Sequence, residues 1–567
     1  MRREKNELFQ VRIADMSDTG EGIGKTDGFT WFIKDAVIGD LVEAKAMKVK
    51  KAYGFARLMQ VLEPSPHRVI PPCPVARSCG GCQLQAMDYG EQLRFKENKV
   101  KNNLCRIGGI DCEGLFEPII AMEDPWRYRN KAQFPFGRSK EGKVITGFYA
   151  GRTHKIIECE DCLLGVPQNA GILACIRNHM EEYGIAPYDE ETHSGLVRHV
   201  LIRKGFKTGE ILVCLVINGN VEELKAADVL TRQLLGLPAG EGSSKVATVV
   251  CSINKDRTNV ILGTEFVNLY GQGSIMDYIG NIAYRISPQS FYQVNPLQTE
   301  HLYKTVLEYA ELTGEETVWD LYCGIGTISL FLAQRAGKVC GVEIVPQAIR
   351  DARANAKWNG ISNVDFFVGE AEKVLPEQYE KNHVRADVIV VDPPRKGCDE
   401  KCLDTIAKMA PERVVYVSCD SATLARDVKF LCGRGYEVRR VRCCDMFPQT
   451  GHVETIVLLS HKSPDSHINV KIEFGEGEGK VPLDAIAERA KKYQPKPKIT
   501  YKMIQEYVEK KYGFKVHTAY IAEVKRSLGL TMYDAPNVVA EELKQRKHPP
   551  KEKVEAIKDA LKYFEII

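Results

Sequence analysis

Apolar and polar positions follow different patterns along the chain, and each pattern predicts a different kind of domain. Residues 1–62 alternate short apolar stretches with glycine turns, as in FQVRIADM followed by SDTGEGIG. Five short strands at this spacing predict a small β-barrel. Residues 291–462 instead alternate apolar strands such as ADVIVVDPP with helical segments such as PQAIRDARANAKWNG. Regular alternation of strands and helices predicts a doubly wound parallel sheet.

Two further segments complete the expected organisation. Residues 63–290 open with a proline-rich stretch, PSPHRVIPPCPV, and continue as a mixed α/β region with strand-like runs such as GEILVCLVING. Residues 463–567 have the pattern of charged helices, and ITYKMIQEYVEKKYG followed by HTAYIAEVKRSLGL is typical of a small helical domain. A chain of 567 residues is too long for one core. We therefore expect an α/β protein with a barrel, a central domain, a doubly wound domain and a helical extension.

Composition excludes several classes of protein. Hydrophobic residues make up 44% of the chain and charged residues 27%, the balance of ordinary globular proteins rather than of fibrous or disordered ones. No stretch approaches the roughly 18 apolar residues of a membrane span, and the start lacks the apolar run of a secretory signal. We therefore expect a cytoplasmic protein whose 18 cysteines are reduced. The net charge of +3 leaves nucleic-acid binding to local patches.

The run KAMKVKKAYGF in the expected barrel is one such patch. It places four lysines beside Tyr53 and Phe55. Basic side chains next to aromatic rings on a small barrel are typical of an RNA-binding surface. A strand edge that lysines protect from pairing explains the run equally well.

Five cysteines form a group that departs from the others, most of which stand singly in apolar runs. Three occur in CPVARSCGGC, at positions 73, 79 and 82, and two follow in IIECEDCLLG, at 159 and 162. Three close thiols and one distant thiol can hold an iron–sulfur cluster or a zinc ion. The spacing is neither that of a zinc ribbon nor the CxxxCxxC of radical enzymes, and it leaves both metals open.

The loop DLYCGIGT, which begins at Asp320, lies between an expected strand and an expected helix. Its glycines permit a sharp turn and a close approach of a ligand to the backbone, although they also suit a simple strand–helix turn. Glu343 ends the next expected strand, where a carboxylate can bind both ribose hydroxyls. The loop is shorter than a dinucleotide-binding loop and suits a nucleoside such as S-adenosylmethionine.

Three later motifs bring reactive side chains to the same crevice, because the carboxyl ends of parallel strands meet at one edge of a sheet. Asp392 follows ADVIVV, Cys419 follows VVYVS, and Glu454 lies in FPQTGHVE ahead of an apolar strand. A helix expected just after Cys419 would lower the pKa of its thiol and favour the nucleophilic thiolate. Glu454 is a candidate general base.

The motifs SPQSFYQVNPLQTEHLY, DLYCGIGTISL, DPPRKG, YVSCDSATLARD and CDMFPQTGHVE occur in this order. Together they resemble the S-adenosylmethionine-dependent RNA uracil-5 methyltransferases, over about residues 1–460. The barrel resembles the TRAM RNA-binding domain of these enzymes, and the doubly wound domain their Rossmann-like methyltransferase domain. The CxxxxxCGGC element with a later cysteine resembles the branch that carries a [4Fe-4S] cluster and acts mainly on 23S ribosomal RNA.

The resemblance implies roles for the residues that match the family motifs. Cys419 matches the nucleophile and Glu454 the base. The cofactor-pocket positions match Gln293, Tyr322, Glu343 and Asp392, with Gln293 and Asp392 also near the target uracil, and Glu370 is a weaker match to an adenosine contact. The cluster ligands match Cys73, Cys79, Cys82 and Cys162, and Cys159 is interpreted as a bystander. Asp420 departs from the usual asparagine, and its charge would raise the pKa of the neighbouring thiol.

The function implied is methyl transfer from S-adenosylmethionine to carbon 5 of a uridine in 23S ribosomal RNA, through a covalent adduct between Cys419 and carbon 6. We expect a monomer without an obligate protein partner, acting on a base that has left its stack. The alternatives are a transfer RNA uridine methyltransferase, an RNA-binding iron–sulfur protein with an inactive methyltransferase fold, and a methylthiolating radical enzyme. Residues 463–567 lie outside the resemblance, and RNA contact, protein contact and plain packing all remain open for them.

Overall fold

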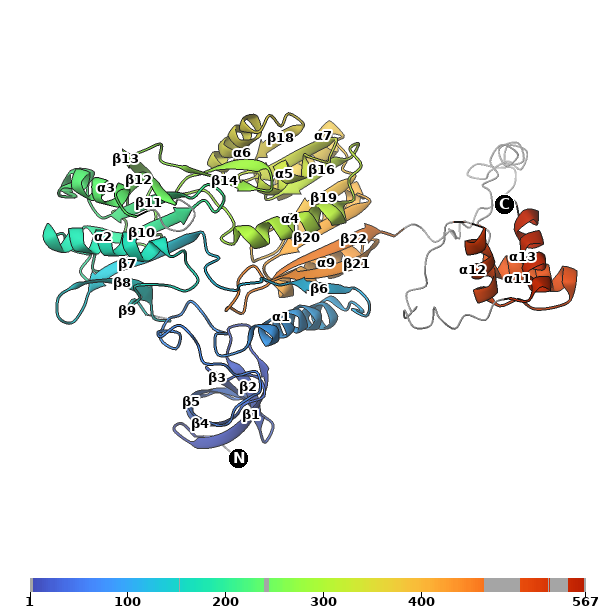
Figure 1. Cartoon of the computed structure of the whole chain (residues 1–567), viewed down its shortest axis with the longest axis horizontal. Coiled ribbons are helices and arrows are strands. Elements are labelled where there is room, and N and C mark those ends of the chain that lie inside the picture. Colours follow the sequence, from blue (N-terminus) through green and yellow to red (C-terminus); the bar gives the residue numbers. More distant parts are fainter. Residues whose placement is uncertain are drawn as a thin grey trace, which may run out of the picture. The chain divides into compact units, whose positions relative to one another are not determined.

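The computed structural model describes residues 4–151, 153–238, 244–462, 500–528, 530 and 549–564. The chain divides into two compact units, residues 1–464 and 465–567. The first unit contains the barrel, a central sheet and a second, larger sheet, which Figure 1 shows in blue, green and yellow to orange. No helix among the described residues is both long enough and apolar enough to cross a membrane.

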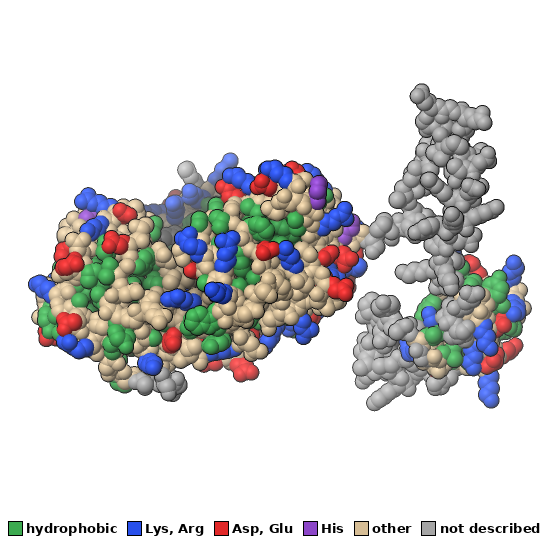
Figure 2. Space-filling view, turned by 90° about the horizontal axis from the view of Figure 1, so that it is seen from above, with side chains coloured by type: hydrophobic (Ala, Val, Ile, Leu, Met, Phe, Trp, Pro, Cys, Tyr) green, Lys and Arg blue, Asp and Glu red, His purple; other side chains and the backbone are tan. Residues whose placement is uncertain are grey.

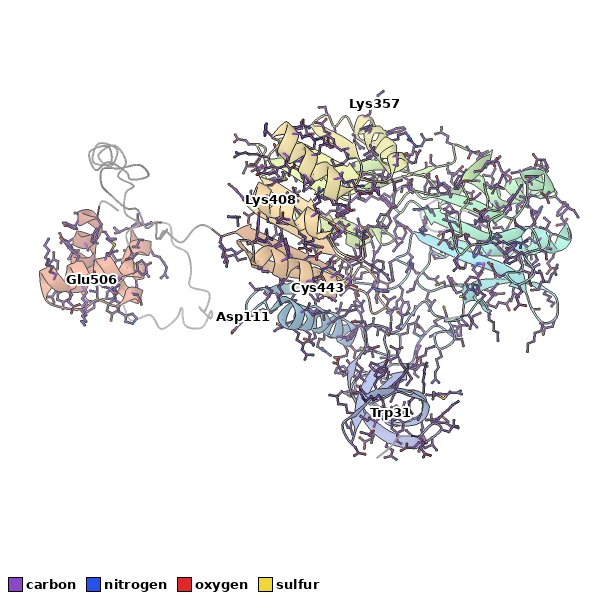
Figure 3. All side chains as sticks on the ribbon, turned by 180° about the vertical axis from the view of Figure 1, so that it is seen from behind. Trp31, Asp111, Lys357, Lys408, Cys443 and Glu506 are labelled. Carbon is purple, nitrogen blue, oxygen red and sulfur yellow. The ribbon has the colours of Figure 1, made fainter. Side chains whose placement is uncertain are left out.

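The N-terminal barrel is closed by five strands in the order β1-β2-β3-β5-β4. Their bounds are β1 Leu8–Met16, β2 Gly22–Thr26, β3 Phe29–Lys34, β4 Leu41–Val49 and β5 Tyr53–Glu63. Every second residue of β1 from Phe9 to Ile13 points inward, as the alternating sequence requires. Trp31 fills the interior, fully buried and stacked on Phe9 with ring centroids 4.4 Å apart (Figure 3). The predicted barrel is therefore present.

The central domain is built on a seven-stranded sheet in the order β13-β12-β11-β10-β7-β8-β9. The strands are β7 Lys131–Arg138, β8 Val144–Tyr149, β9 Ile156–Glu158, β10 Val197–Lys204, β11 Glu210–Ile217, β12 Lys245–Ile253 and β13 Glu265–Tyr270. Helices α2 Gln168–Glu182 and α3 Ala227–Leu235 cover one face (Figure 1). The other face of β10 and β11 packs into the core of the methyltransferase-like domain. Burial on both faces explains their continuous apolar runs.

The second sheet has eight strands in the order β18-β17-β16-β19-β20-β22-β21-β6. Its strands are β6 Phe116–Ile120, β16 Thr317–Leu321, β17 Lys338–Glu343, β18 Val364–Val368, β19 Val388–Val391, β20 Arg413–Ser418, β21 Tyr436–Cys444 and β22 Glu454–His461. The strands are parallel except β22, which is antiparallel to both neighbours. The chain order reverses between β16 and β19, which is where ligands bind to open α/β sheets.

Helices cover both faces of this sheet, as the doubly wound expectation requires. They are α4 Pro296–Ala310, α5 Thr327–Leu332, α6 Pro346–Trp358, α7 Ala371–Asn382, α8 Glu400–Met409 and α9 Ser421–Cys432. Val388 and Val390 of β19 pack with α4, α5 and α6, whereas Ile389 and Val391 pack with α7, α8 and α9. A hairpin of β14 Ile275–Ile279 and β15 Ile282–Ile286 leads into this domain.

One segment of the expected central domain lies with the larger sheet instead. Helix α1, Tyr89–Asn103, continues into a π-helical turn, Leu104–Gly108, and then β6 pairs in parallel with β21. Val100 and Leu104 are fully buried in the core beneath α9. The range 63–290 is therefore divided in space, because α1 buries its apolar face against the methyltransferase-like sheet and β6 covers the edge of that sheet.

The described residues of the second unit form helices joined by short connecting segments. Its helices are α11 Tyr501–Tyr512, α12 Thr518–Ser527 and α13 Lys551–Tyr563, with a core around Ile504, Ile521 and Ile557. Gly513 ends α11 in the left-handed conformation, at φ 77°, which glycine adopts without strain. Most of the remaining residues of 463–567, namely 463–499 and 531–548, lie outside the described part of the chain, so the expected helical extension over the whole range stays a prediction.

Candidate active site and cysteine cavity

The loop after β16 makes the sharp turn that its glycines predict. Tyr322, Gly324 and Gly326 all have positive φ, at 68°, 55° and 80°. Left-handed backbone is unfavourable for a tyrosine, and it is found where the surrounding structure fixes the conformation. The turn leads directly into α5, with Gly326 at its N-cap position.

Glu343 lies at the end of β17, beside this loop. One carboxylate oxygen accepts a hydrogen bond from the Gly324 N–H at 3.2 Å, and the other accepts one from the Val345 N–H at 2.9 Å. The side chain is half-buried. These contacts orient the carboxylate at the position where a ribose would lie against the loop.

A second carboxyl, that of Asp320, lies under the loop and was given no role by the sequence. It is fully buried, and its Oδ2 accepts a hydrogen bond from the Ser329 hydroxyl at 2.5 Å. Its Oδ1 has no hydrogen-bond partner among the described residues. Burial, reinforced by Asp392 and Glu343, raises the pKa of Asp320 to about 7. A ligand that brings positive charge would relieve this crowding of carboxyls, and S-adenosylmethionine carries both a sulfonium and an ammonium group.

Cys419 and Glu454 face each other across two strands. Ser418, the last residue of β20, pairs with Thr455 of β22, so Cys419 and Glu454 lie directly beyond this pair, at the ends of the two strands. They are close enough for the charge of Glu454 to raise the pKa of the Cys419 thiol. The Glu454 side chain is buried, and burial together with the nearby Asp392 raises its pKa to about 8. Burial likewise raises the pKa of Asp392 to about 7. The predicted nucleophile, base and pocket aspartate therefore gather at one edge of the sheet.

The pKa of the Cys419 thiol moves in the direction opposite to the expectation. Helix α9 begins at Ser421, and Asp420 caps it by accepting hydrogen bonds from the N–H groups of Ala422 and Thr423. Burial nevertheless raises the pKa of Cys419 to about 11, and Glu454 and Asp392 add to the rise. Desolvation and two carboxyls from neighbouring strands thus outweigh the helix terminus.

Arg395 is the cation that faces this group of acids. It lowers the pKa of both Cys419 and Glu454, against the larger effect of burial. Its own carbonyl accepts a hydrogen bond from the Thr423 hydroxyl at 3.1 Å, which ties its loop to α9. Arg395 stands in the motif DPPRKG, but a surface arginine after two prolines gave no sequence signal for this role.

For Gln293 and Glu370, two of the predicted pocket residues, the described contacts do not include the other site residues. The carbonyl of Gln293 accepts a hydrogen bond from the Asn130 amide at 2.9 Å, in the segment that leads into α4. Tyr303 of α4 lies close enough to Asp392 and Glu454 for their charges to raise its pKa. Glu370 caps α7 and pairs with Lys373 at 2.6 Å, so the described contacts give its side chain a local role.

All five cysteines of the sequence cluster line one cavity of about 260 Å³. They are Cys73, Cys79, Cys82, Cys159 and Cys162. Burial raises the pKa of Cys82 and of Cys159 to about 12, and the other thiols add to each rise. Cys159, interpreted as a bystander, therefore shares the cavity with the four predicted ligands. No group of three or more His, Cys, Asp or Glu side chains among the described residues is arranged to hold a single metal ion.

The charges around the cysteine cavity are one-sided. Arg129 and Lys131 line it, and none of its described lining residues is acidic. Burial lowers the pKa of Lys131 to about 8, and the neighbouring Arg203 and Arg129 lower it further. Arg129 and Lys131 repel each other, and a negatively charged group in the same cavity would stabilise both. A metal group with four thiolate ligands carries such a charge.

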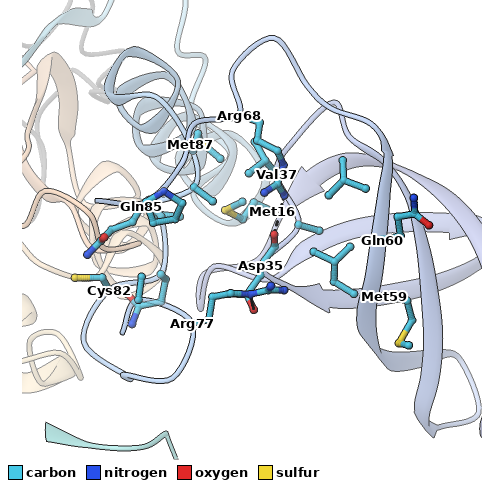
Figure 4. A pocket seen from close by; sticks show the side chains of 18 residues that line it. Met16, Asp35, Val37, Met59, Gln60, Arg68, Arg77, Cys82, Gln85 and Met87 are labelled. Carbon is cyan, nitrogen blue, oxygen red and sulfur yellow. Dashed lines mark hydrogen bonds and ion pairs between the residues drawn. The ribbon is translucent and has the colours of Figure 1, made fainter. Parts of the chain in front are cut away.

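A second cavity, of about 230 Å³, separates the cysteine loop from the barrel (Figure 4). Arg68, in the segment between them, binds the Asp40 carboxylate of the barrel at 2.6 Å and the Asp35 carbonyl at 2.8 Å. Lys34 of β3 donates to the carbonyl of Arg77, which lies between Cys73 and Cys79, at 2.8 Å. Cys82 and Gln85 line both cavities. The barrel is thereby fixed against the cysteine loop rather than joined by the chain alone.

Comparison with known proteins identifies the family. The sequence model described as tRNA (Uracil-5-)-methyltransferase matches residues 208–462, and the TRAM domain model matches residues 2–59. An RNA methyltransferase of Clostridium tetani is 48% identical over 458 residues, which cover 81% of this chain and 97% of the relative. The chain belongs to the RNA uracil-5 methyltransferase family. A relative from Halalkalibacterium halodurans, also named an RNA methyltransferase, is 50% identical over 459 residues, covering 81% of this chain and 98% of its own.

A solved structure supports the fold of this methyltransferase and its methyl donor. The tRNA (uracil-54, C5)-methyltransferase of Pyrococcus abyssi, in complex with S-adenosyl-L-homocysteine, superposes with a TM-score of 0.63 at 25% identity. The match covers 80% of this chain and all of that structure. The protein is thus an S-adenosylmethionine-dependent RNA methyltransferase with an N-terminal TRAM barrel. Both family models end by residue 462, so the helical unit lies beyond them.

Proposed function

We propose that this methyltransferase transfers a methyl group to carbon 5 of a uridine in 23S ribosomal RNA, through a covalent adduct with Cys419. The observation that carries the proposal is the placement of Cys419 opposite Glu454, next to the loop and carboxylate that suit S-adenosylmethionine. Carbon 5 of uracil is a poor nucleophile until a thiolate adds to carbon 6. A thiol and a base on facing strands match the two ends of that reaction.

Each residue has a step in the proposed mechanism. Cys419 adds to carbon 6 of the uracil and makes carbon 5 nucleophilic. S-adenosylmethionine supplies the methyl group. Glu454 then takes the proton from carbon 5, the carbon 5–carbon 6 double bond re-forms, and the electron pair of the carbon–sulfur bond returns to Cys419. Glu343 and Tyr322 hold the cofactor, while Gln293 and Asp392 contact both the cofactor and the uracil.

The substrate is tested with purified protein, labelled S-adenosylmethionine, and unmodified 23S ribosomal RNA and transfer RNA in parallel. We expect label in 5-methyluridine from the ribosomal RNA, and mapping of the labelled nucleoside would identify the position. The target base must leave its stack to reach Cys419, so a loop is expected to be the site. Label in neither RNA would favour an RNA-binding protein with an inactive site.

Transfer RNA is the second candidate substrate, and a specific finding favours it. The Pyrococcus abyssi structure is that of a transfer RNA enzyme, and the matching family model has transfer RNA in its description. The cysteine group is what favours ribosomal RNA, through the branch of the family that it resembles. Label confined to transfer RNA in the parallel assay would keep the mechanism and replace the substrate.

We further propose that Cys73, Cys79, Cys82 and Cys162 hold a [4Fe-4S] cluster. A zinc ion lies about 2.3 Å from each sulfur and so draws its thiolates close together, whereas a cluster binds each thiolate through a different iron. The residues present fit a cluster, since five thiols line one cavity of about 260 Å³, and Arg129 and Lys131 would offset the negative charge of a thiolate-bound cluster. We assign the cluster a structural role, and a methyl-transfer rate that follows its oxidation state would overturn that assignment.

Metal analysis of two cysteine variants tests the ligand set. Anaerobically purified wild-type protein should contain roughly four irons and four sulfides per chain. Cys162→Ala should lose most of both, because it removes one ligand. Cys159→Ala is the matched control from the same cavity and should keep the iron and the visible absorption. Equal loss of iron and sulfide from the two variants would show that Cys159 also contributes to the cluster site. One zinc per chain without sulfide would contradict the cluster.

Activity should rise with pH between about 6 and 8. A carboxyl whose pKa is raised to about 8 is protonated below that pH, so the basic form of Glu454 becomes more abundant as pH increases. The thiolate of Cys419 increases in the same direction, because its pKa is about 11. Glu454 acts after methyl transfer, so its titration is measured in the rate at which the methylated adduct breaks down, and this rate should climb by up to about tenfold per pH unit in this window. The ratio kcat/KM follows the Cys419 thiol instead. An adduct breakdown rate that stays flat or falls with pH would contradict Glu454 as the base.

The remaining parts of the proposal follow from the substrate. A ribosomal RNA enzyme would act in the cytoplasm, and we propose a monomer, since one chain supplies the nucleophile, the base and the cofactor loop. Figure 2 shows basic and acidic side chains intermixed on one face of the first unit, in keeping with the small net charge. RNA binding by this chain is therefore assigned to local features such as the barrel rather than to one large basic field.

A further inference from the structure

The loop of residues 445–453, here called the base loop, joins β21 to β22 and ends at Glu454. It is deeply buried, with Asp445 and Met446 at 0% exposure and Gln449 at 3%. Its backbone carbonyls accept hydrogen bonds from several distant segments of the chain. Asn295 donates to the Met446 carbonyl at 3.1 Å, and Gln298 donates to that of Asp445 at 3.2 Å. The position of Glu454 is therefore set from outside its own strand.

Helix α1 supplies the charged contacts to the base loop. Lys96 Nζ lies 2.5 Å from Asp445 Oδ1 and 3.0 Å from the Phe447 carbonyl, and both charged side chains are fully buried. Lys99 donates to the Gly451 carbonyl at 3.2 Å. This pair ties the base loop to α1. Removing either partner would leave an uncompensated charge in the core, so mutation of either residue should be strongly destabilising.

Gln92 of α1 and Gln449 of the base loop exchange two hydrogen bonds between uncharged groups. The Gln92 Nε2 donates to Gln449 Oε1 at 3.0 Å, and the Gln449 N–H donates to Gln92 Oε1 at 3.1 Å. Gln449 has φ 68°, in the left-handed region that residues with a side chain rarely adopt. The pair therefore holds a strained residue five positions before the base.

The cysteine cavity contacts the base loop from the other side. The N–H groups of Gln83 and Leu84, which directly follow Cys82, both donate to the Gln449 carbonyl at 3.0 Å. The Tyr128 hydroxyl donates to the Pro448 carbonyl at 3.0 Å. Its neighbour Arg127 donates to the Cys162 carbonyl, also at 3.0 Å. Cys82 is followed directly by two residues that donate to the base loop, and Cys162 is hydrogen-bonded to the neighbour of a third donor, Tyr128.

We propose that Gln92 is a positioning residue for proton abstraction. Together with the amides that follow Cys82, it fixes the base loop and so holds the Glu454 carboxylate against carbon 5 of the uracil. In that step the proton passes from carbon 5 to Glu454, the carbon 5–carbon 6 double bond forms, and the carbon 6–sulfur bond breaks with its electrons on sulfur. A displaced loop slows this step alone, because thiolate addition and methyl transfer do not use the base. The inference rests on the proposed function.

The test compares Gln92→Ala with Asn98→Ala, an exposed and uncharged position on the same helix. For Gln92→Ala we expect kcat to fall on the order of tenfold or more, with kcat/KM for RNA changed by less than about twofold. The KM falls together with kcat, because the slowed step follows methyl transfer. The methylated enzyme–RNA adduct should accumulate as a species that survives denaturation. Gln449→Ala removes only the Gln92 Nε2–Gln449 Oε1 contact and keeps the Gln449 N–H bond to Gln92, so it should act in the same direction with a smaller effect. The double variant should be no worse than Gln92→Ala, which already lacks both contacts. Asn98→Ala should match the wild type.

Three outcomes would overturn the inference in distinguishable ways. A wild-type enzyme that methylates uridine, with a Gln92→Ala variant of unchanged kcat and no extra adduct, would overturn the positioning role and keep the proposed function. A lowered melting temperature with unchanged kcat would reduce Gln92 to a packing residue. A wild-type protein that forms no 5-methyluridine in any RNA would remove the proposed function and this inference with it.

Discussion

Replacing Cys419 with alanine should reduce methyl transfer by more than about 1,000-fold, because the variant has no nucleophile to activate the uracil. Without addition at carbon 6, carbon 5 lacks the electron density to attack a sulfonium methyl group. The site otherwise remains intact, since Cys419 is only half-buried and its loss leaves the Asp420 cap of α9 in place. The measurement is label transferred from S-adenosylmethionine to 5-methyluridine under single-turnover conditions.

Two controls separate the loss of the nucleophile from general damage. Cys105→Ala removes an exposed cysteine and should retain full activity. Binding of S-adenosylhomocysteine, measured by calorimetry, should be unchanged in Cys419→Ala. RNA with 5-fluorouridine at the target should trap the wild type as a stable adduct, because carbon 5 then has no proton to lose, and should not trap the variant. A variant within about tenfold of wild-type turnover would rule out covalent catalysis by this thiol.

The raised pKa of Cys419 makes the nucleophile dependent on the bound complex. In the free protein, burial and the carboxyls of Glu454 and Asp392 keep the thiol protonated at neutral pH. Arg395 opposes this effect, and the sulfonium of the methyl donor would add a second positive charge at the same strand ends. Under the proposed mechanism, a bound methyl donor would therefore favour the thiolate of Cys419.

The sheets were predictable because their signals are local. The strand β19 is apolar at every position from Val388 to Val391, and it is buried on both faces by helices on either side. The barrel strands alternate because only one face is covered. The sequence did not predict that β6 pairs with β21, since five residues that include a proline carry little periodicity and pairing across 300 positions leaves no local trace.

The same distinction separates the site residues. The sequence predicted Glu343, Asp392 and Cys419 at the carboxyl ends of strands, and in the structure they end β17 or directly follow β19 and β20. The contacts that support them come from far away in the chain. Lys96 and Gln92 lie on α1, and their partners lie about 350 positions later, at Asp445 and Gln449. The pKa of Cys419 was misjudged for the same reason: the helix terminus is visible in the sequence, whereas desolvation is not.

Glu454→Gln should slow product release by about 100- to 10,000-fold while leaving the fold intact. The pKa of Glu454 is raised to about 8, so at neutral pH the buried carboxyl is largely uncharged in the free protein. A glutamine of the same shape therefore replaces a mostly neutral group and imposes no new charge on the core. It cannot accept the proton from carbon 5. The methylated uracil should then remain bound to Cys419, and the adduct should be isolated on a denaturing gel with both labelled RNA and labelled methyl.

The order of events gives this variant a signature that a merely damaged enzyme lacks. A first methyl group per enzyme should transfer at nearly the wild-type rate, because addition and methyl transfer precede the base, and later turnovers should stop. Glu412→Gln, at the opposite end of the same sheet and largely exposed, is the matched control and should turn over normally. If Glu454→Gln releases product within about tenfold of the wild type and no adduct forms, another group takes the proton. Asp392 is then the first to test, because its charge raises the pKa of both Cys419 and Glu454.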